Sequence, residues 1–238
     1  FRGIREEHGR PEMYDTGLYE RSQAFALDDA GCQASAELAY GELLLSGVTS
    51  LADLSSMSSW WIDLIARSGL RGFIAPGFAS SRWYMESFQE LKFNWNEGAG
   101  RKVFEKAIEF ISEAEAHPSG RLSGVIYPMQ IDTCSEDLLR DCVALAEETN
   151  RPITTHASQS QVEFLLMAKR HGVSPIKWAS NIGLLSPRTT LGHAIFVDEH
   201  PSIDWRTRED VSLLADSGTS VAHCPSPFAR YGHAMADF

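Results

Sequence analysis

The stretch RPITTHASQSQVEF (residues 151–164) combines a short β-prone run, a histidine and a polar turn that leads into a helical segment. This strand–turn–helix unit recurs along the chain, and the spacing of its hydrophobic residues predicts where each element lies. Strands are predicted at 48–54, 72–78, 122–129, 152–156, 189–196 and 219–223. Helices are predicted at 60–67, 100–116, 135–149, 161–170 and 208–216, with one or two more within 18–45.

The alternation of strands and helices favours a parallel sheet with right-handed crossovers. No GxGxxG or GxxxxGK[ST] sequence follows a predicted strand, so a dinucleotide-binding or P-loop domain would lack its phosphate-binding loop. We therefore predict an α/β fold, a (β/α)8 TIM barrel, that forms a single domain over residues 1–238. A cofactor-free Rossmann-like sheet is the alternative, and it would place the strand-end histidines on different faces.

The composition excludes several classes of partner. The 238 residues carry a formal net charge of −11, which argues against nucleic acid or an anionic membrane, since both need a basic surface. The four cysteines form no C-x-x-C pair, which argues against a thiolate zinc site and favours reduced thiols. The sequence has neither a signal peptide nor an apolar run near the ~18 residues of a membrane helix. We expect a cytoplasmic protein.

Three predicted strands end alike, in ITTHA (153–157), TLGHA (190–194) and SVAHC (220–224). Because the carboxyl ends of barrel strands all meet at one face, their histidines, His156, His193 and His223, are expected to converge there. One strand-end histidine alone is more simply a hydrogen-bonded structural residue. Three at equivalent positions favour a site for zinc or iron, because neutral imidazole is a common ligand of both metals.

A mononuclear hydrolytic metal site needs three or four protein ligands and an open position for water. The chain offers His156 as one ligand and His193 as a second candidate, so the number of ligands falls short. Either the site holds no metal, or the missing ligands lie outside this chain.

Four segments follow the order and spacing of a known family: AELAYGELLLSGVTSLADL (36–54), ITTHASQSQVE (153–163), GLLSPRTTLGHAIFVDE (183–199) and DVSLLADSGTSVAHCPSPFAR (210–230). Through them the sequence resembles the amidohydrolase superfamily, especially its branch of cytosine deaminases, guanine deaminases and triazine hydrolases. The resemblance implies a TIM barrel of the metal-dependent hydrolase type. It also implies one divalent metal ion, with zinc as the expected metal and iron as the alternative.

In this family the first strand bears an H-x-H pair of metal ligands shortly before an RG dipeptide. Arg2-Gly3 matches the dipeptide, so the pair is expected just before Phe1, and the ligating aspartate of strand eight is expected beyond Phe238. The chain is thus expected to hold strands two to seven of the barrel, without strands one and eight and without the family's small β-sandwich. By itself such a chain is expected to be inactive.

The resemblance also assigns roles to the three histidines. His156 matches the metal ligand on strand five. His193 matches the histidine on strand six, which contacts the attacking water or the substrate, or binds a second metal. His223 lies in the H-C-P motif of strand seven, for which a structural or substrate-facing role is expected.

Gln159 departs from the family pattern. Deaminases of this branch have H-x-x-E on strand five, and that glutamate shuttles protons to the substrate ring. Gln159 stands in its place and can orient a substrate through its amide, but it cannot transfer a proton. Glu163 lies one helical turn further, where helix geometry is expected to point it elsewhere.

An aromatic segment, SSRWYMESFQELKFNWN (80–96), follows the strand predicted at 72–78. As a loop overhanging the barrel mouth it would bring Trp83 and Trp95 against a planar heterocyclic substrate. The alternative is that its aromatic side chains cover the barrel rim or a subunit interface. A homo-oligomer is expected.

These features predict a metal-dependent hydrolase in which metal-activated water cleaves a carbon–nitrogen bond, other than a peptide bond, of a small cyclic substrate. The substrate is expected to be a heterocycle or an amide. One alternative is a chlorohydrolase-like displacement on a heterocycle. The other is a non-catalytic relative of the barrel that only binds a ligand, as Gln159 would allow.

Overall fold

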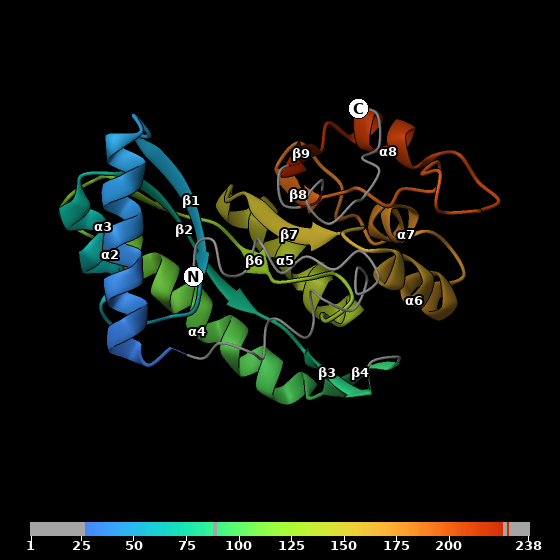
Figure 1. Cartoon of the computed structure of the whole chain (residues 1–238), viewed down its shortest axis with the longest axis horizontal. Helices are drawn as coiled ribbons and strands as arrows, with labels where there is room; N and C mark the ends of the chain where they lie inside the picture. Colours follow the sequence, from blue (N-terminus) through green and yellow to red (C-terminus); the bar gives the residue numbers. More distant parts are fainter. Residues whose placement is uncertain (1–26, 88–89, 226–227, 229–238) are drawn as a thin grey trace.

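The computed structural model describes residues 27–87, 90–225 and 228 (Figure 1). The helices are α2 (Asp29–Leu45), α3 (Trp61–Ser68), α4 (Glu97–Glu115), α5 (Glu136–Thr149), α6 (Gln161–His171), α7 (Pro175–Asn181) and α8 (Asp210–Ser217). The strands are β1 (Ser50–Ser55), β2 (Arg71–Phe78), β3 (Ser81–Ser87), β4 (Glu90–Trp95), β5 (Leu122–Gly124), β6 (Tyr127–Pro128), β7 (Ile153–Ala157), β8 (Thr189–His193) and β9 (Ser220–Ala222).

The parallel strands follow one another in chain order. β1 pairs with β2, and β2 pairs first with β5 and then with β6. Parallel bridges from Ile126 to Ile153 and from Gln130 to His156 carry the ladder to β7, which pairs with β8, and β8 with β9. The predicted parallel sheet is confirmed, and its order lacks the reversal of a doubly wound Rossmann sheet. Over the described residues the ladder does not close into a barrel.

Strand β7 shows how the sheet divides the interior. Ile153, Thr155 and Ala157 are buried and alternate with the less enclosed Thr154 and His156, since successive side chains of a strand point to opposite faces. One face of β7 therefore packs against helices, and the other carries His156.

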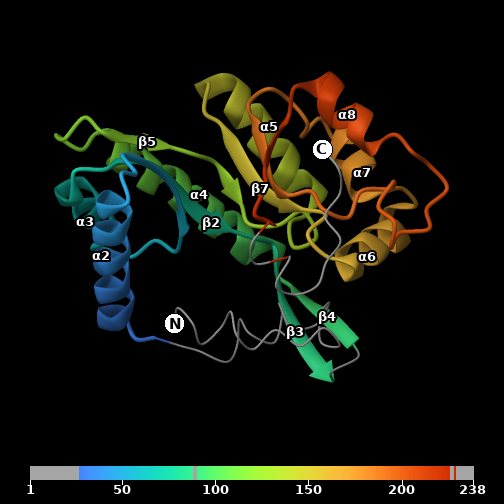
Figure 2. The same cartoon turned by 45° about the horizontal axis from the view of Figure 1, so that its top comes forward.

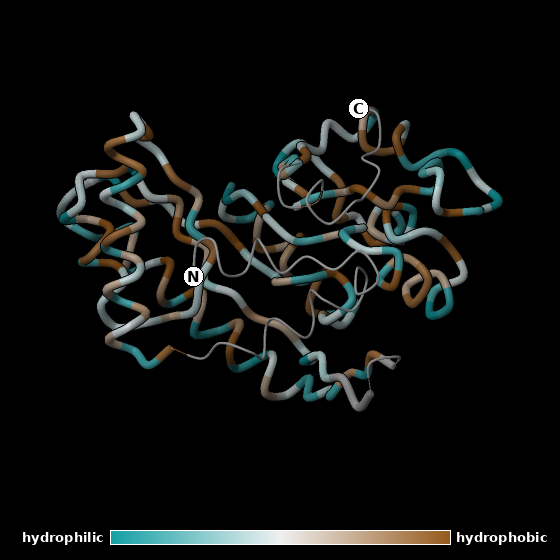
Figure 3. The backbone as a smooth tube through the Cα atoms, in the orientation of Figure 1, coloured by the Kyte–Doolittle hydropathy of each residue, from teal (hydrophilic) through white to brown (hydrophobic). Residues whose placement is uncertain are grey.

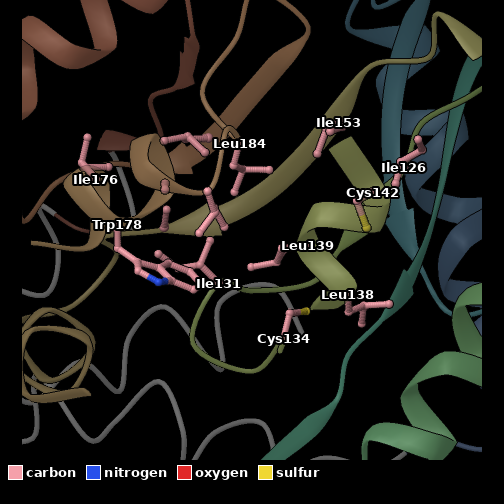
Figure 4. Packing of buried hydrophobic residues seen from close by; sticks show 14 of the residues in the cluster. Ile126, Ile131, Cys134, Leu138, Leu139, Cys142, Ile153, Ile176, Trp178 and Leu184 are labelled. Atoms are coloured by element: carbon pink, nitrogen blue, oxygen red, sulfur yellow. The ribbon is translucent and has the colours of Figure 1, made fainter. Parts of the chain in front are cut away.

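The main core lies between this sheet and the helices beside it. Leu138, Leu139 and Cys142 of α5 belong to one buried cluster with Ile126 and Ile153 from the strand layer (Figure 4). The helix begins where the sequence indicates, because the side chain of Ser135 accepts a hydrogen bond from the first turn, as an N-cap serine does.

A second core holds α2 and α3 against the first strands, at the blue end of the chain in Figure 1. The Tyr40 hydroxyl of α2 donates to the carboxylate of Asp53 on β1, and Trp61 Nε1 of α3 donates to the same carboxylate at 2.7 Å. α3 ends at Gly69, whose φ of 90° is the left-handed conformation that glycine adopts easily at a helix end.

Hydropathy follows this arrangement. Figure 3 shows hydrophobic stretches along the interior strands, whereas the loop between β8 and α8 starts with a hydrophobic stretch and becomes largely hydrophilic further on. No helix among the described residues is both long enough and apolar enough to span a membrane.

The first turn of α4 contains two glycines in contrasting surroundings. A Cβ on Gly100 would lie 2.7 Å from the carbonyl oxygen of Ala79 and 2.8 Å from Cα of Ser80, whereas a Cβ on Gly98 would meet only Asn96 Oδ1 at 4.0 Å. We expect Gly100→Ala to lower the free energy of unfolding by about 1–3 kcal/mol, since rigid backbone cannot move aside. Gly98→Ala is the matched control and should be neutral or stabilising by up to about 1 kcal/mol. Urea unfolding of both variants measures the difference, and equal stabilities would contradict this packing.

Four features differ from the sequence-based prediction. The strand predicted at 122–129 is divided into β5 and β6. Residues 80–96 do not form a loop: β3 and β4 pair as an antiparallel hairpin, which Figure 2 shows extending beyond the end of β2. The strand predicted at 189–196 ends at His193, because His193 and Ala194 take positive φ angles of 77° and 45°. The short helix α7 was not predicted. The expected helical residues 18–26 lie outside the described residues.

Candidate active site

His156 stands near the carboxyl end of β7 with one ring nitrogen held by the backbone. Its Nδ1 lies 2.8 Å from the carbonyl oxygen of Met129, to which it donates, and 3.3 Å from the Tyr127 hydroxyl. Burial lowers the pKa of His156 from its usual value, so the ring is neutral near pH 7. With the proton fixed on Nδ1, the lone pair on Nε2 is free to bind a metal.

His193 ends β8 directly beside His156. The ring centroids are 5.2 Å apart and the rings are inclined by 33°. The β-ladder pairs His193 with Ala157 rather than with His156, so regular alternation would place the two imidazoles on opposite faces of the sheet. The positive φ of His193 breaks this alternation. The rings therefore meet on the same side.

Gly192 leaves room for this arrangement. It is the ladder partner of His156, and a Cβ at this position would lie 2.9 Å from Cδ2 of the His156 ring. The absence of a side chain on β8 thus allows the His156 ring to pack over the neighbouring strand.

The environment keeps His193 neutral as well. Burial, and secondarily the nearby His156, lower the pKa of His193 to about 4. Its Nδ1 is enclosed and has no hydrogen-bond partner among the described residues. Its ring also meets the Phe228 ring edge-on, with centroids 4.7 Å apart. Two uncharged imidazoles that lie side by side are chemically suitable as ligands of a metal ion.

His223 directly follows β9, and so lies at the same edge of the sheet as the other two histidines. Its side chain is exposed. The sequence pattern thus correctly placed all three residues at the carboxyl ends of neighbouring parallel strands.

Gln159 is buried, with 3% of its surface exposed, and its side-chain Nε2 donates to Oε1 of Gln130. The turn that carries it is shaped by Glu163, whose two carboxylate oxygens accept the backbone N–H groups of Ser158 at 2.7 Å and Gln159 at 2.9 Å. Ser158 adopts a positive φ of 53° in this turn. The buried carboxyl group of Glu163 therefore fixes the backbone at Gln159.

Glu163 does not point to the site, in agreement with the expectation from helix geometry. Burial, and then the charge of Asp132, raise the pKa of the fully buried Glu163 to about 8. Its supporting role was missed, although the sequence carries a signal: Ser160 caps α6 by accepting the N–H of Glu163 at 3.0 Å, the S-x-x-E pattern of a capping box.

The aromatic hairpin is tied to the rest of the fold by polar and cationic contacts. Trp83 Nε1 donates to Oδ2 of the buried Asp132 at 3.1 Å. The guanidinium of Arg170 lies 5.1 Å from the ring centroids of both Phe93 and Trp95, a cation–π distance. Trp95 is 40% exposed. A stacking role for Trp83 and Trp95 toward substrate stays a prediction.

The described residues do not by themselves form a complete metal site. Among them no group of three or more His, Cys, Asp or Glu side chains could hold a metal ion. His156 and His193 nevertheless fit such an ion, because both are neutral and Nε2 of His156 carries a free lone pair.

Comparison with known sequences identifies relatives of this chain. The model of the amidohydrolase family matches residues 8–237. The chain is 28% identical over 204 residues to a 5-methylthioadenosine/S-adenosylhomocysteine deaminase of Haloarcula marismortui. The alignment covers 86% of this chain and 42% of the relative. A 5′-deoxyadenosine deaminase of Methanothermobacter thermautotrophicus is 27% identical over 199 residues, and the alignment covers 82% of this chain and 40% of that relative. The chain thus spans less than half the length of these relatives.

Solved structures give the same result for the fold. An adenosine deaminase from Xanthomonas campestris with bound zinc superimposes with a TM-score of 0.73 at 17% identity, over 96% of this chain and 48% of that one. A zinc complex of atrazine chlorohydrolase from Arthrobacter aurescens gives a TM-score of 0.71 at 18% identity, over 98% of this chain and 53% of that one. The predicted resemblance is confirmed, and the chain belongs to the amidohydrolase family.

Proposed function

We propose that the protein is a metal-dependent hydrolase that cleaves a carbon–nitrogen bond, other than a peptide bond, of a small cyclic substrate. The observation that carries the proposal is the pair of neutral imidazoles, His156 and His193, whose rings lie 5.2 Å apart. The carbonyl of Met129 orients the first of them. The fold and the zinc in related structures support the same chemistry.

His156 would hold a divalent ion, zinc being the expected metal, through Nε2. When bound, zinc lowers the pKa of a water molecule to about 7 and so supplies a nucleophile at neutral pH. His193 is uncharged at this pH, and its Nε2 would accept a hydrogen bond from the attacking water and so orient it, since its Nδ1 is enclosed and its low pKa makes it a weak base. Gln159 would orient the substrate through its amide and would transfer no proton.

The open ladder from β1 to β9 would be strands two to seven of a single-domain TIM barrel, with Trp83, Trp95 and His223 near the substrate. Gln159 also favours a second candidate reaction, a chlorohydrolase-like displacement of chloride from a heterocycle, because chloride leaves as a stable anion and needs no proton from this position. The cytoplasmic location and the homo-oligomer stay predictions.

Metal content tests the proposal. We expect the full-length protein to contain nearly one equivalent of zinc. Removal of zinc by a chelator should abolish ammonia release from 5-methylthioadenosine or guanine, or the ring opening of a cyclic amide, with recovery when zinc is restored. Elemental analysis and product assays are the measurements. Less than about one tenth of an equivalent of metal per chain would instead favour the non-catalytic, ligand-binding alternative.

A further inference from the structure

Gln130 lies beside His156, the proposed metal ligand, and has no assigned role. It forms a parallel β-bridge with His156, closed by hydrogen bonds from His156 N to Met129 O and from Ile131 N to His156 O, both 3.1 Å. Directly bridged residues of parallel strands point to the same face of a sheet. The Gln130 side chain therefore lies on the face that carries the His156 ring.

Gln130 and Gln159 form a side-chain amide pair in which Gln159 Nε2 donates to Gln130 Oε1. The bond leaves one polar atom of each amide, Gln159 Oε1 and Gln130 Nε2, without a hydrogen-bond partner among the described residues. The first is an acceptor and the second is a donor. The pair thus combines an acceptor and a donor in one hydrogen-bonded unit.

The pair is held rigidly from both sides. Glu163 fixes the backbone of Gln159 through a 2.9 Å hydrogen bond, and the β-bridge fixes that of Gln130. Gln159 is almost fully buried and Gln130 is half-buried. A ligand therefore meets a preorganised pattern, which reduces the entropy that is lost on binding.

We propose that Gln130 is a specificity-determining residue, which together with Gln159 binds a planar substrate edge that carries one donor and one adjacent acceptor. Cyclic amides present such an edge through N–H and C=O, and cyclic amidines through NH2 and a ring nitrogen. In both cases the substrate donor meets Gln159 Oε1 and its acceptor meets Gln130 Nε2. This inference rests on the proposed function and narrows its substrate class.

The substitution Gln130→Glu isolates the donor. A carboxylate keeps the acceptor for Gln159 Nε2, but it has no N–H for the substrate. In the zinc-loaded full-length protein we expect KM to rise at least about tenfold, the loss of roughly one good hydrogen bond, with zinc content and Tm unchanged. Gln161→Glu makes the same chemical change at a residue whose side chain bonds to the Ser202 carbonyl, and it should leave KM unchanged.

Substrate analogues test the other half of the pair. The probes are 5-methylthioadenosine as the amidine and dihydrouracil as the amide, each compared with its N6,N6-dimethyl or 1,3-dimethyl counterpart, which lacks the edge donor. The wild type should bind one parent compound at least about tenfold more tightly than its methylated form, and Gln159→Met should remove that preference. The parent compound that shows the preference identifies the substrate edge as amide or amidine.

The outcomes separate the two proposals. Zinc binding and turnover with an unchanged KM in Gln130→Glu, or equal binding of parent and methylated probes, overturn the role of the amide pair and leave the hydrolase standing. A protein without zinc and without turnover overturns the hydrolase, and the substrate edge with it.

Discussion

Replacing His156 with alanine should remove zinc from the full-length protein and reduce kcat/KM by well over about 100-fold. Even the loss of an outer hydrogen bond to a metal-bound histidine costs about 10–100-fold, and this substitution would remove a ligand itself. His156 is the residue that the Met129 carbonyl orients and that Gly192 accommodates. The measurements are zinc content by elemental analysis and steady-state kinetics with the best substrate.

His117→Asn is the control for this experiment. His117 accepts a hydrogen bond from the backbone of Ser119 at 3.1 Å and lies 3.6 Å from the carboxylate of Asp63. It therefore belongs to the partly exposed segment that follows α4 and contacts α3. Its replacement should leave zinc content intact and change kcat/KM by no more than about twofold, as is usual for surface positions. Full turnover and full zinc in the His156 variant would end the hydrolase proposal.

Phe164→Ala should lower the free energy of unfolding by about 3–5 kcal/mol, the range for removal of a buried aromatic side chain. Phe164 of α6 is fully buried and meets the Trp205 ring edge-on, with centroids 5.5 Å apart. It packs in one cluster with Ile195 and Phe196, which follow β8. Its removal leaves a cavity between α6 and the segment that follows His193, so the geometry of the site should loosen as stability falls.

Leu165 provides the matched control because it is the next residue of the same helix and is 54% exposed. Leu165→Ala should change the free energy of unfolding by no more than about 0.5 kcal/mol. Urea denaturation at constant pH compares both variants with the wild type. A loss of less than about 1 kcal/mol for Phe164→Ala would mean that the surrounding residues fill the cavity.

The order of the elements could be predicted from the sequence because it depends on local signals. Hydrophobic periodicity located the parallel strands and most helices, and Ser135 and Gly69 marked helix ends that the structure confirms. The signal for α7 was present too, since Ser174 caps the helix and Pro175 occupies its first turn. The hairpin was misread because its aromatic residues were assigned to a loop over the site rather than to paired strands.

The site was predictable only in part, for a geometric reason. A strand-end histidine is visible in the sequence, but the turn of His193 toward His156 depends on a positive φ that histidine rarely adopts. Gln130 carries no local signal of its own. Its place beside His156 follows from the parallel bridges that join the segment around β6 to β7, which only the folded sheet defines.

The left-handed backbone at His193 also limits how this family member can evolve. If a relative did not need imidazole for the proposed catalysis, this position would still need a residue that tolerates the conformation. Drift would then lead first to glycine or asparagine, which adopt it at little strain, and hardly ever to valine or isoleucine. Selection for folding alone would therefore favour glycine or asparagine at this position, whereas selection for the proposed catalysis would keep histidine.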